Sequence, residues 1–140
     1  MVIKQGFEKH SIRADISRKF IKGSGISMDA VRTLDELNQG TTKVARAIPN
    51  AFRAFREMRD TIISDGKLSV KEKELIAVGI AVSIRCHYCV ARHIKNALDV
   101  GASREEIAEA ISVSILMGGG SALTYAAEAM NIIDQLSANG

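Results

Sequence analysis

Residues 69–84, with the sequence SVKEKELIAVGIAVSI, combine a helix start with a long apolar run. Ser69 followed by Glu72 fits a capping box, in which each side chain accepts a hydrogen bond from the other residue's backbone amide. From Leu75 onward the residues are apolar on nearly every side of a helix, which is typical of a core position. We therefore expect a buried central helix here and an all-α fold around it.

The same signals predict helices on both sides of this segment. Ser27 fits a helix cap, Gly40 fits a helix end, and a second capping box begins at Ser103. We expect further helices over residues 28–38, 50–65, 86–100, 103–117 and 121–136. The three glycines at 118–120 should break the chain between the last two. This gives a bundle of five to six helices.

Composition and charge indicate one globular domain with a basic extension. The chain has 140 residues, of which 46% are hydrophobic, and this is enough to bury a core. Residues 1–26 carry six Lys or Arg against two acidic residues, while residues 27–140 are close to neutral. We predict a partly flexible basic arm over 1–26 and a helical domain over 27–140. Without a sustained run of like charge, the arm is not expected to bind nucleic acid.

The chain shows no sign of membrane insertion or secretion. Its first twenty residues are rich in charge, unlike a secretory signal. The longest uncharged window, residues 110–127, contains seven Gly, Ser or Thr, which disfavours a membrane span. We predict a cytoplasmic protein.

The two cysteines of the chain lie in the segment Cys86-His87-Tyr88-Cys89, and His93 follows one helical turn after Cys89. On a helix, Cys86, Cys89 and His93 share one narrow stripe. Thiols near a helix N-terminus ionise more readily, and two intervening residues allow a reversible disulfide. Because only Cys89 lies one turn from His93, we expect it to be the better-activated thiol. On the same helix Arg92, Lys95, Asn96 and Asp99 are expected to face away.

A carboxylate is needed to orient His93 as a base. The candidates are Glu72 and Glu74 in the preceding helix, and the capping box already uses Glu72. Glu74 borders the apolar run, where a buried carboxylate requires a partner. We therefore select Glu74.

Two other interpretations of the cysteine segment are open. The cysteines could simply be small buried residues of the core. A metal site would require four ligands, and Cys86, Cys89 and His93 supply three. We predict neither a bound metal nor an organic cofactor.

The spacing Glu74, eleven residues, Cys86-x-x-Cys89-x-x-x-His93 resembles the signature of alkylhydroperoxidase D-like proteins of the carboxymuconolactone decarboxylase superfamily. Residues 115–130 (ILMGGGSALTYAAEAM) are also similar to the segment that follows this signature, and the resemblance covers roughly 28–136. One position departs from the pattern. The best-known members have a histidine immediately before the second cysteine, whereas this chain has Tyr88 there and His87 one place earlier.

The resemblance implies an all-helical fold in a homotrimer or homohexamer, with thiol-based peroxidase or disulfide reductase activity. It implies that Cys89 attacks a hydroperoxide, that Cys86 resolves the product, and that Glu74 and His93 relay protons. An external dithiol protein would then reduce the disulfide. His87 and Tyr88 would be accessory residues. The alternatives are a non-catalytic metal-binding or redox-sensing module and a lactone decarboxylase relative.

Overall fold

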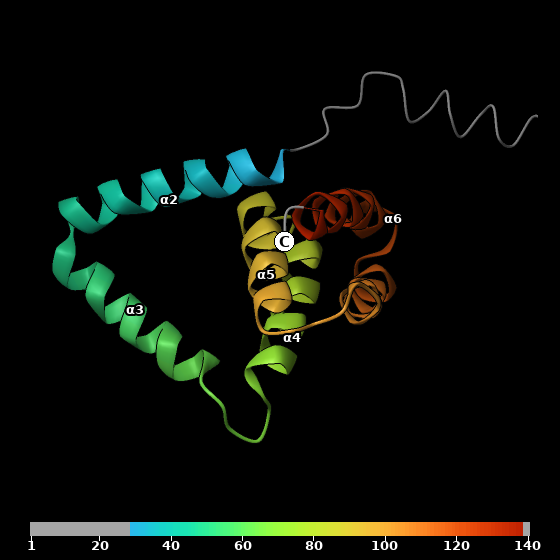
Figure 1. Cartoon of the computed structure of the whole chain (residues 1–140), viewed down its shortest axis with the longest axis horizontal. Helices are drawn as coiled ribbons and strands as arrows, with labels where there is room; N and C mark the ends of the chain where they lie inside the picture. Colours follow the sequence, from blue (N-terminus) through green and yellow to red (C-terminus); the bar gives the residue numbers. More distant parts are fainter. Residues whose placement is uncertain (1–28, 139–140) are drawn as a thin grey trace, which may run out of the picture.

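The computed structural model describes residues 29–138, and this part of the chain is all-helical (Figure 1). The helices in chain order are α2 (Ala30–Ala47), α3 (Pro49–Ile63), α4 (Val70–Ser83), α5 (His87–Asp99) and α6 (Arg104–Ser137). The all-α prediction is confirmed. The predictions for the basic arm and for Ser27 lie outside the described residues.

Helices α4, α5 and α6 pack together as a core. Their fully buried side chains include Val78, Val82, Ile94, Ile107, Ile132 and Ile133. Gly79 allows α4 and α6 to approach closely, because a Cβ atom there would lie 3.1 Å from the Ala110 carbonyl oxygen. Within this core, α4 carries Glu74, α5 carries Cys89 and His93, and Cys86 is the N-cap residue of α5.

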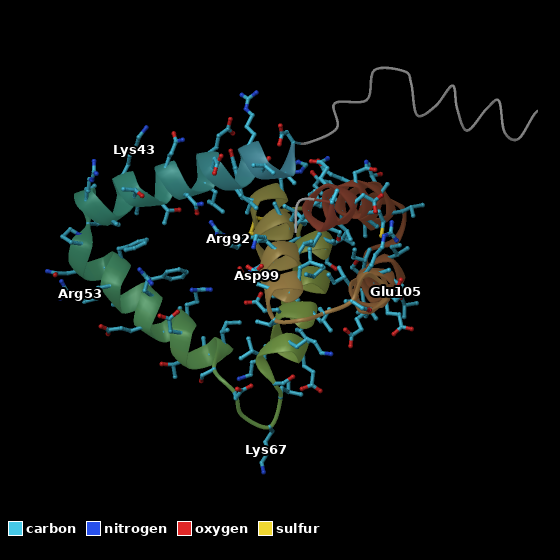
Figure 2. All side chains as sticks on the ribbon, in the orientation of Figure 1. Lys43, Arg53, Lys67, Arg92, Asp99 and Glu105 are labelled. Atoms are coloured by element: carbon cyan, nitrogen blue, oxygen red, sulfur yellow. A yellow bond between two sulfur atoms is a disulfide. The ribbon has the colours of Figure 1, made fainter. Side chains whose placement is uncertain are left out.

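Helices α2 and α3 form an angular unit beside this core (Figure 1). We call these two helices the arm, and residues 1–26 the basic arm. The arm meets the core mainly through the start of α2, where Ala30 and Leu34 are buried. Helix α3 has no buried residue and touches only α2 and α4 among the described helices. Lys73 holds its C-terminal end by donating to the Ile62 and Ser64 carbonyl oxygens. In Figure 2 the charged side chains of Lys43 and Arg53 point outward from the arm.

Both predicted capping boxes are confirmed, at the starts of α4 and α6. The backbone amide and hydroxyl of Ser69 hydrogen-bond to Glu72 and hold the pKa of that carboxyl below its usual value. The pKa of Glu106 is also lowered, first by the hydrogen bond from Lys71 and then by the Ser103 backbone amide. Glu106 therefore caps α6 and ties it to α4.

Both ends of α2 differ from the sequence prediction of a helix over residues 28–38. Helix α2 begins after Asp29, which caps it, and continues through Gly40 to Ala47. A lone glycine costs an exposed helix only about 1 kcal/mol, so the residues beyond Gly40 can extend it. The predicted break at the three glycines is confirmed: Gly119 has the non-helical angles φ 63° and ψ −149° and divides α6 into two halves that meet at a kink.

The prediction that the central helix is fully buried is only partly right. Val78 and Val82 are inaccessible, but Ile76 and Ile80 on the opposite face are about half exposed. Among the described residues 29–138, no other helix covers that face.

Helix α6 is long and apolar enough to cross a membrane by length and composition. It is, however, kinked at Gly119, and residues of both halves, such as Ile107 and Ile132, are buried against the core. Packing in the core accounts for residues such as Ile107 and Ile132, whereas Leu116 and Met117 beside the kink are largely exposed.

Candidate active site

The turn between α4 and α5 determines where the cysteines lie. Arg85 has φ 59°, a left-handed conformation that turns the chain sharply after α4. The amide of Cys86 then donates to the Ala81 carbonyl oxygen at 3.1 Å. Arg85 also donates to the Ser121 hydroxyl, just after the α6 kink, at 3.0 Å. The turn is therefore bonded to both α4 and α6.

Cys86 and Cys89 form a disulfide at the N-terminus of α5. Cys86 is the N-cap residue of this helix and lies outside the helical conformation, and its sulfur accepts from the Cys89 amide at 3.3 Å. Cys89 lies in the first turn. Both sulfurs are thus close to the positive end of the helix dipole, which stabilises a thiolate once the disulfide is reduced.

His93 on α5 and Glu74 on α4 are hydrogen-bonded to each other. The distance between His93 Nδ1 and Glu74 Oε2 is 2.6 Å, and the Glu74 side chain is only 2% exposed. In the neutral tautomer in which Nδ1 donates to this carboxylate oxygen, Nε2 keeps its lone pair. His93 is one turn after Cys89 on α5, where side chains four residues apart are neighbours. The arrangement can accept a proton from a reduced Cys89.

Asn96 is a member of this cluster that the sequence analysis placed wrongly. Its side-chain amide donates to Glu74 Oε1 at 3.1 Å, so it does not face away from the site. Its position three residues after His93 was the available signal, because i and i+3 residues share a helix face. Each oxygen of Glu74 therefore has its own partner on α5.

His87 lies apart from the Glu74 pair and contacts α6. Its Nδ1 is 2.8 Å from Glu128 Oε2, and its ring lies 4.8 Å from that of Tyr125. Glu128 was not identified from the sequence, because nothing in the spacing links it to His87. The pair connects the first turn of α5 to the second half of α6.

Tyr88, between the two cysteines, is about half exposed and faces the arm. It lines an apolar hollow of about 530 Å³ whose other walls come from α2 and α3. The lining includes Leu37, Val44, Phe52 and Phe55. An apolar surface therefore begins beside the disulfide segment.

Within residues 29–138, no three His, Cys, Asp or Glu side chains are grouped so that they could hold a metal ion.

A family profile and a solved structure both match this chain to carboxymuconolactone decarboxylase family proteins. The profile of the carboxymuconolactone decarboxylase family matches residues 49–131. An uncharacterised protein of Cupriavidus necator is 37% identical over 81% of this chain and 100% of its own length. The alkyl hydroperoxide reductase AhpD of Mycobacteroides abscessus is 31% identical over 44% of this chain and 35% of its own length.

Solved structures show the same fold. A carboxymuconolactone decarboxylase family protein of Legionella pneumophila has a TM-score of 0.75 and 30% identity, covering 77% of this chain and 96% of its own. A family member from Thermotoga maritima, suggested to act in an antioxidative response, has a TM-score of 0.65 and 30% identity. That match covers 79% of this chain and 92% of the other.

Proposed function

This chain belongs to the carboxymuconolactone decarboxylase family as an AhpD-like member, and from this premise we propose that it is a thiol-dependent peroxidase. It would reduce organic hydroperoxides through Cys89 and Cys86, with Glu74 and His93 as a proton relay. The observation that carries the proposal is the buried Glu74–His93 hydrogen bond, one turn from a cysteine that is already paired in a disulfide.

The cycle begins with the reduced protein. His93 Nε2 takes the proton of Cys89, and the thiolate attacks the terminal oxygen of the hydroperoxide. The O–O bond breaks, the Cys89 sulfur becomes a sulfenic acid, and the alkoxide leaves as an alcohol with the proton from His93. The Cys86 thiol then displaces water from the sulfenic acid and forms the disulfide. An external dithiol protein returns both cysteines to thiols by exchange.

Three further features belong to this proposal. We propose that the protein works as a homo-oligomer, a trimer or a hexamer, and that it is cytoplasmic. His87 and Tyr88 would act as accessory residues beside the thiols. The basic segment 1–26 would be an extension of the helical domain rather than part of the site.

The test is the division of labour between the two thiols. Cys89→Ser should abolish peroxide consumption with a dithiol reductant. Cys86→Ser should consume about one peroxide per chain and stop at a sulfenic acid that dimedone traps, because the resolving thiol is missing. If Cys86 were the residue trapped or alkylated first, the assigned roles would be reversed.

Two measurements separate the alternatives. One tightly bound zinc per chain in protein purified without chelator would favour a metal-binding module over the peroxidase. Activity on a lactone acid that survives loss of both thiols would favour a decarboxylase.

A further inference from the structure

We propose that Asn96 is a positioning residue of the relay, which orients Glu74 so that the carboxylate keeps the proton of His93 on Nδ1. This inference rests on the proposed role of His93 as the base for Cys89. Nothing in the cysteine motif or the relay spacing includes Asn96.

The geometry fixes Glu74 at both ends of its carboxylate. His93 Nδ1 lies 2.6 Å from Oε2, and Asn96 Nδ2 lies 3.1 Å from Oε1. Both partners come from α5, three residues apart, while Glu74 comes from α4. The carboxylate therefore cannot rotate about its terminal bond without losing two hydrogen bonds.

Burial makes the second hydrogen bond important for the position of Glu74. Glu74 is 2% exposed, so water cannot replace a lost partner on Oε1 easily. Without the Asn96 donor, the carboxylate is held only through Oε2 and can turn away from His93 Nδ1. The Glu74 oxygen then no longer holds the histidine proton on Nδ1, and the tautomer with the proton on Nε2 becomes populated. In that tautomer Nε2 has no lone pair and cannot accept a proton from Cys89.

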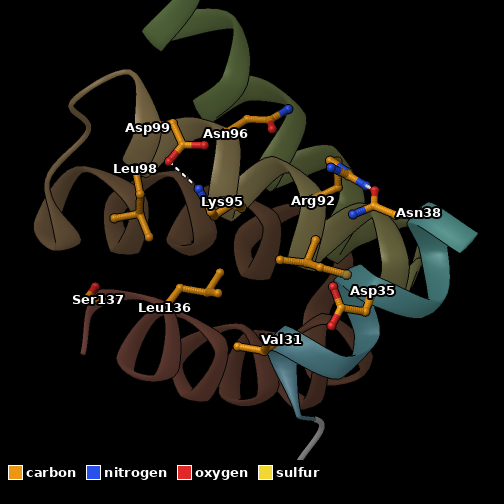
Figure 3. A pocket seen from close by; sticks show the side chains of 11 residues that line it. Val31, Asp35, Asn38, Arg92, Lys95, Asn96, Leu98, Asp99, Leu136 and Ser137 are labelled. Atoms are coloured by element: carbon orange, nitrogen blue, oxygen red, sulfur yellow. Dashed lines mark hydrogen bonds and ion pairs between the residues drawn. The ribbon is translucent and has the colours of Figure 1, made fainter. Parts of the chain in front are cut away.

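An amide suits this position because it donates without adding charge. A lysine or arginine would neutralise Glu74 and weaken its hold on an imidazolium formed when His93 takes a proton. Asn96 lies at the edge of a surface pocket of about 680 Å³, where its side chain extends away from the Lys95–Asp99 ion pair (Figure 3). Those two charges satisfy each other, and Asn96 is the lining residue with a hydrogen bond to Glu74.

The first test measures the tautomer of His93 directly. In the reduced full-length protein, imidazole nitrogen NMR should show the proton on Nδ1, and Asn96→Ala should shift a substantial fraction to Nε2. Asn38→Ala is the matched control, because Asn38 lines the same pocket but bonds to Arg92 and not to the relay. The control should leave the His93 spectrum unchanged.

The second test measures the rate at which Cys89 reacts with an alkylating agent at pH 7, mapped by mass spectrometry. Asn96→Ala should slow this rate about tenfold, the scale expected when a buried acceptor loses its donor, and Asn38→Ala should not. If Asn96→Ala does not fold, Asn96→Asp decides by the same two readouts. Its near-identical shape places a second carboxyl group against Glu74 and should disturb the tautomer in the same direction.

Retention of the Nδ1 tautomer together with an alkylation rate within about twofold of the unmodified chain would overturn the proposal. Neither measurement uses peroxide. If the chain is not a peroxidase, peroxide turnover would be absent, but Asn96→Ala would still change the His93 tautomer and the Cys89 alkylation rate. The two failures can therefore be distinguished.

Discussion

The core of α4, α5 and α6 and the arm of α2 and α3 differ in how far they bury their apolar side chains. In the core, apolar side chains such as Ile94 and Ile132 are inaccessible, and two helices begin with complete capping boxes. In the arm, α3 begins at Pro49 without a side-chain cap, and Phe55 and Ile62 are more than half exposed. Among residues 29–138, the core therefore buries its apolar side chains within one chain, whereas most of the arm is attached only through the start of α2 and the Lys73 hydrogen bonds at the end of α3.

The candidate active site lies at the boundary between these regions. Glu74, His93 and Asn96 belong to the core, where packing fixes their geometry. Tyr88 faces the hollow formed with the arm. Under the proposed function, the core holds the proton relay, and the arm contributes the apolar walls that face Tyr88. The following predictions test that division.

The largest effect is expected in the core, at Glu74. Glu74→Gln keeps the shape of the side chain but removes the charge that holds the His93 proton on Nδ1. The rate of peroxide reduction should fall by about two to four orders of magnitude, the usual contribution of a positioned base. Glu72→Gln is the control, because Glu72 lies on the same helix and caps it without touching the relay. Equal losses in both variants would contradict the relay.

The second prediction compares the same substitution in both regions. Ile94→Ala should lower the free energy of unfolding by about 2–5 kcal/mol, because it empties a packed site. Ile62→Ala in α3 should cost far less, since 58% of that side chain is exposed in the single chain. Chemical denaturation measures both. Equal costs would show that α3 is as well covered as the core.

The third prediction concerns what covers the exposed apolar faces. Phe55, Met58 and Ile62 on α3, and Ile76 and Ile80 on α4, are all at least half exposed. Because apolar faces of this size drive association, we expect a homo-oligomer by light scattering at micromolar concentration. Ile76→Asp should lower the measured mass, whereas Lys67→Asp on the loop should not. A monomer at this concentration would disprove the prediction.

A smaller effect is expected at Tyr88. Tyr88→Phe keeps the aromatic wall of the hollow and should change peroxide turnover by less than about threefold, because a phenol is a poor base near neutral pH. Tyr88→His should raise turnover by supplying a base between the cysteines. Steady-state kinetics of the two variants gives the comparison. A tenfold loss in Tyr88→Phe would assign the hydroxyl a direct role.

The smallest effect concerns the capping boxes of the core. The pKa values of Glu72 and Glu106 are lowered in the folded chain, so their contribution is complete above the unfolded pKa of about 4.3. It is lost as the pH falls through the lower, folded pKa. Tm should therefore decrease by a few degrees over that acid range, and the double variant Glu72→Gln, Glu106→Gln should lose part of this dependence. A calorimetric pH series with an unchanged slope would argue against the capping contribution.

Local patterns in the sequence were sufficient for much of this molecule. Capping boxes and apolar periodicity predicted the positions of α4, α5 and α6, because these signals depend on residues within one turn of each other. The spacing of Glu74, the cysteines and His93 indicated which side chains could meet, and the structure brings Glu74 and His93 together. Their catalytic roles stay predictions.

What the sequence determined by itself is the set of helices and the chemistry available at one helix terminus. Tertiary structure alone decided that Asn96 contacts Glu74 and that His87 pairs with Glu128. Both contacts join residues more than twenty positions apart in the sequence, so no local pattern specifies the partner. They depend on how α4, α5 and α6 pack, because the burial of their apolar faces fixes the distances between their polar side chains.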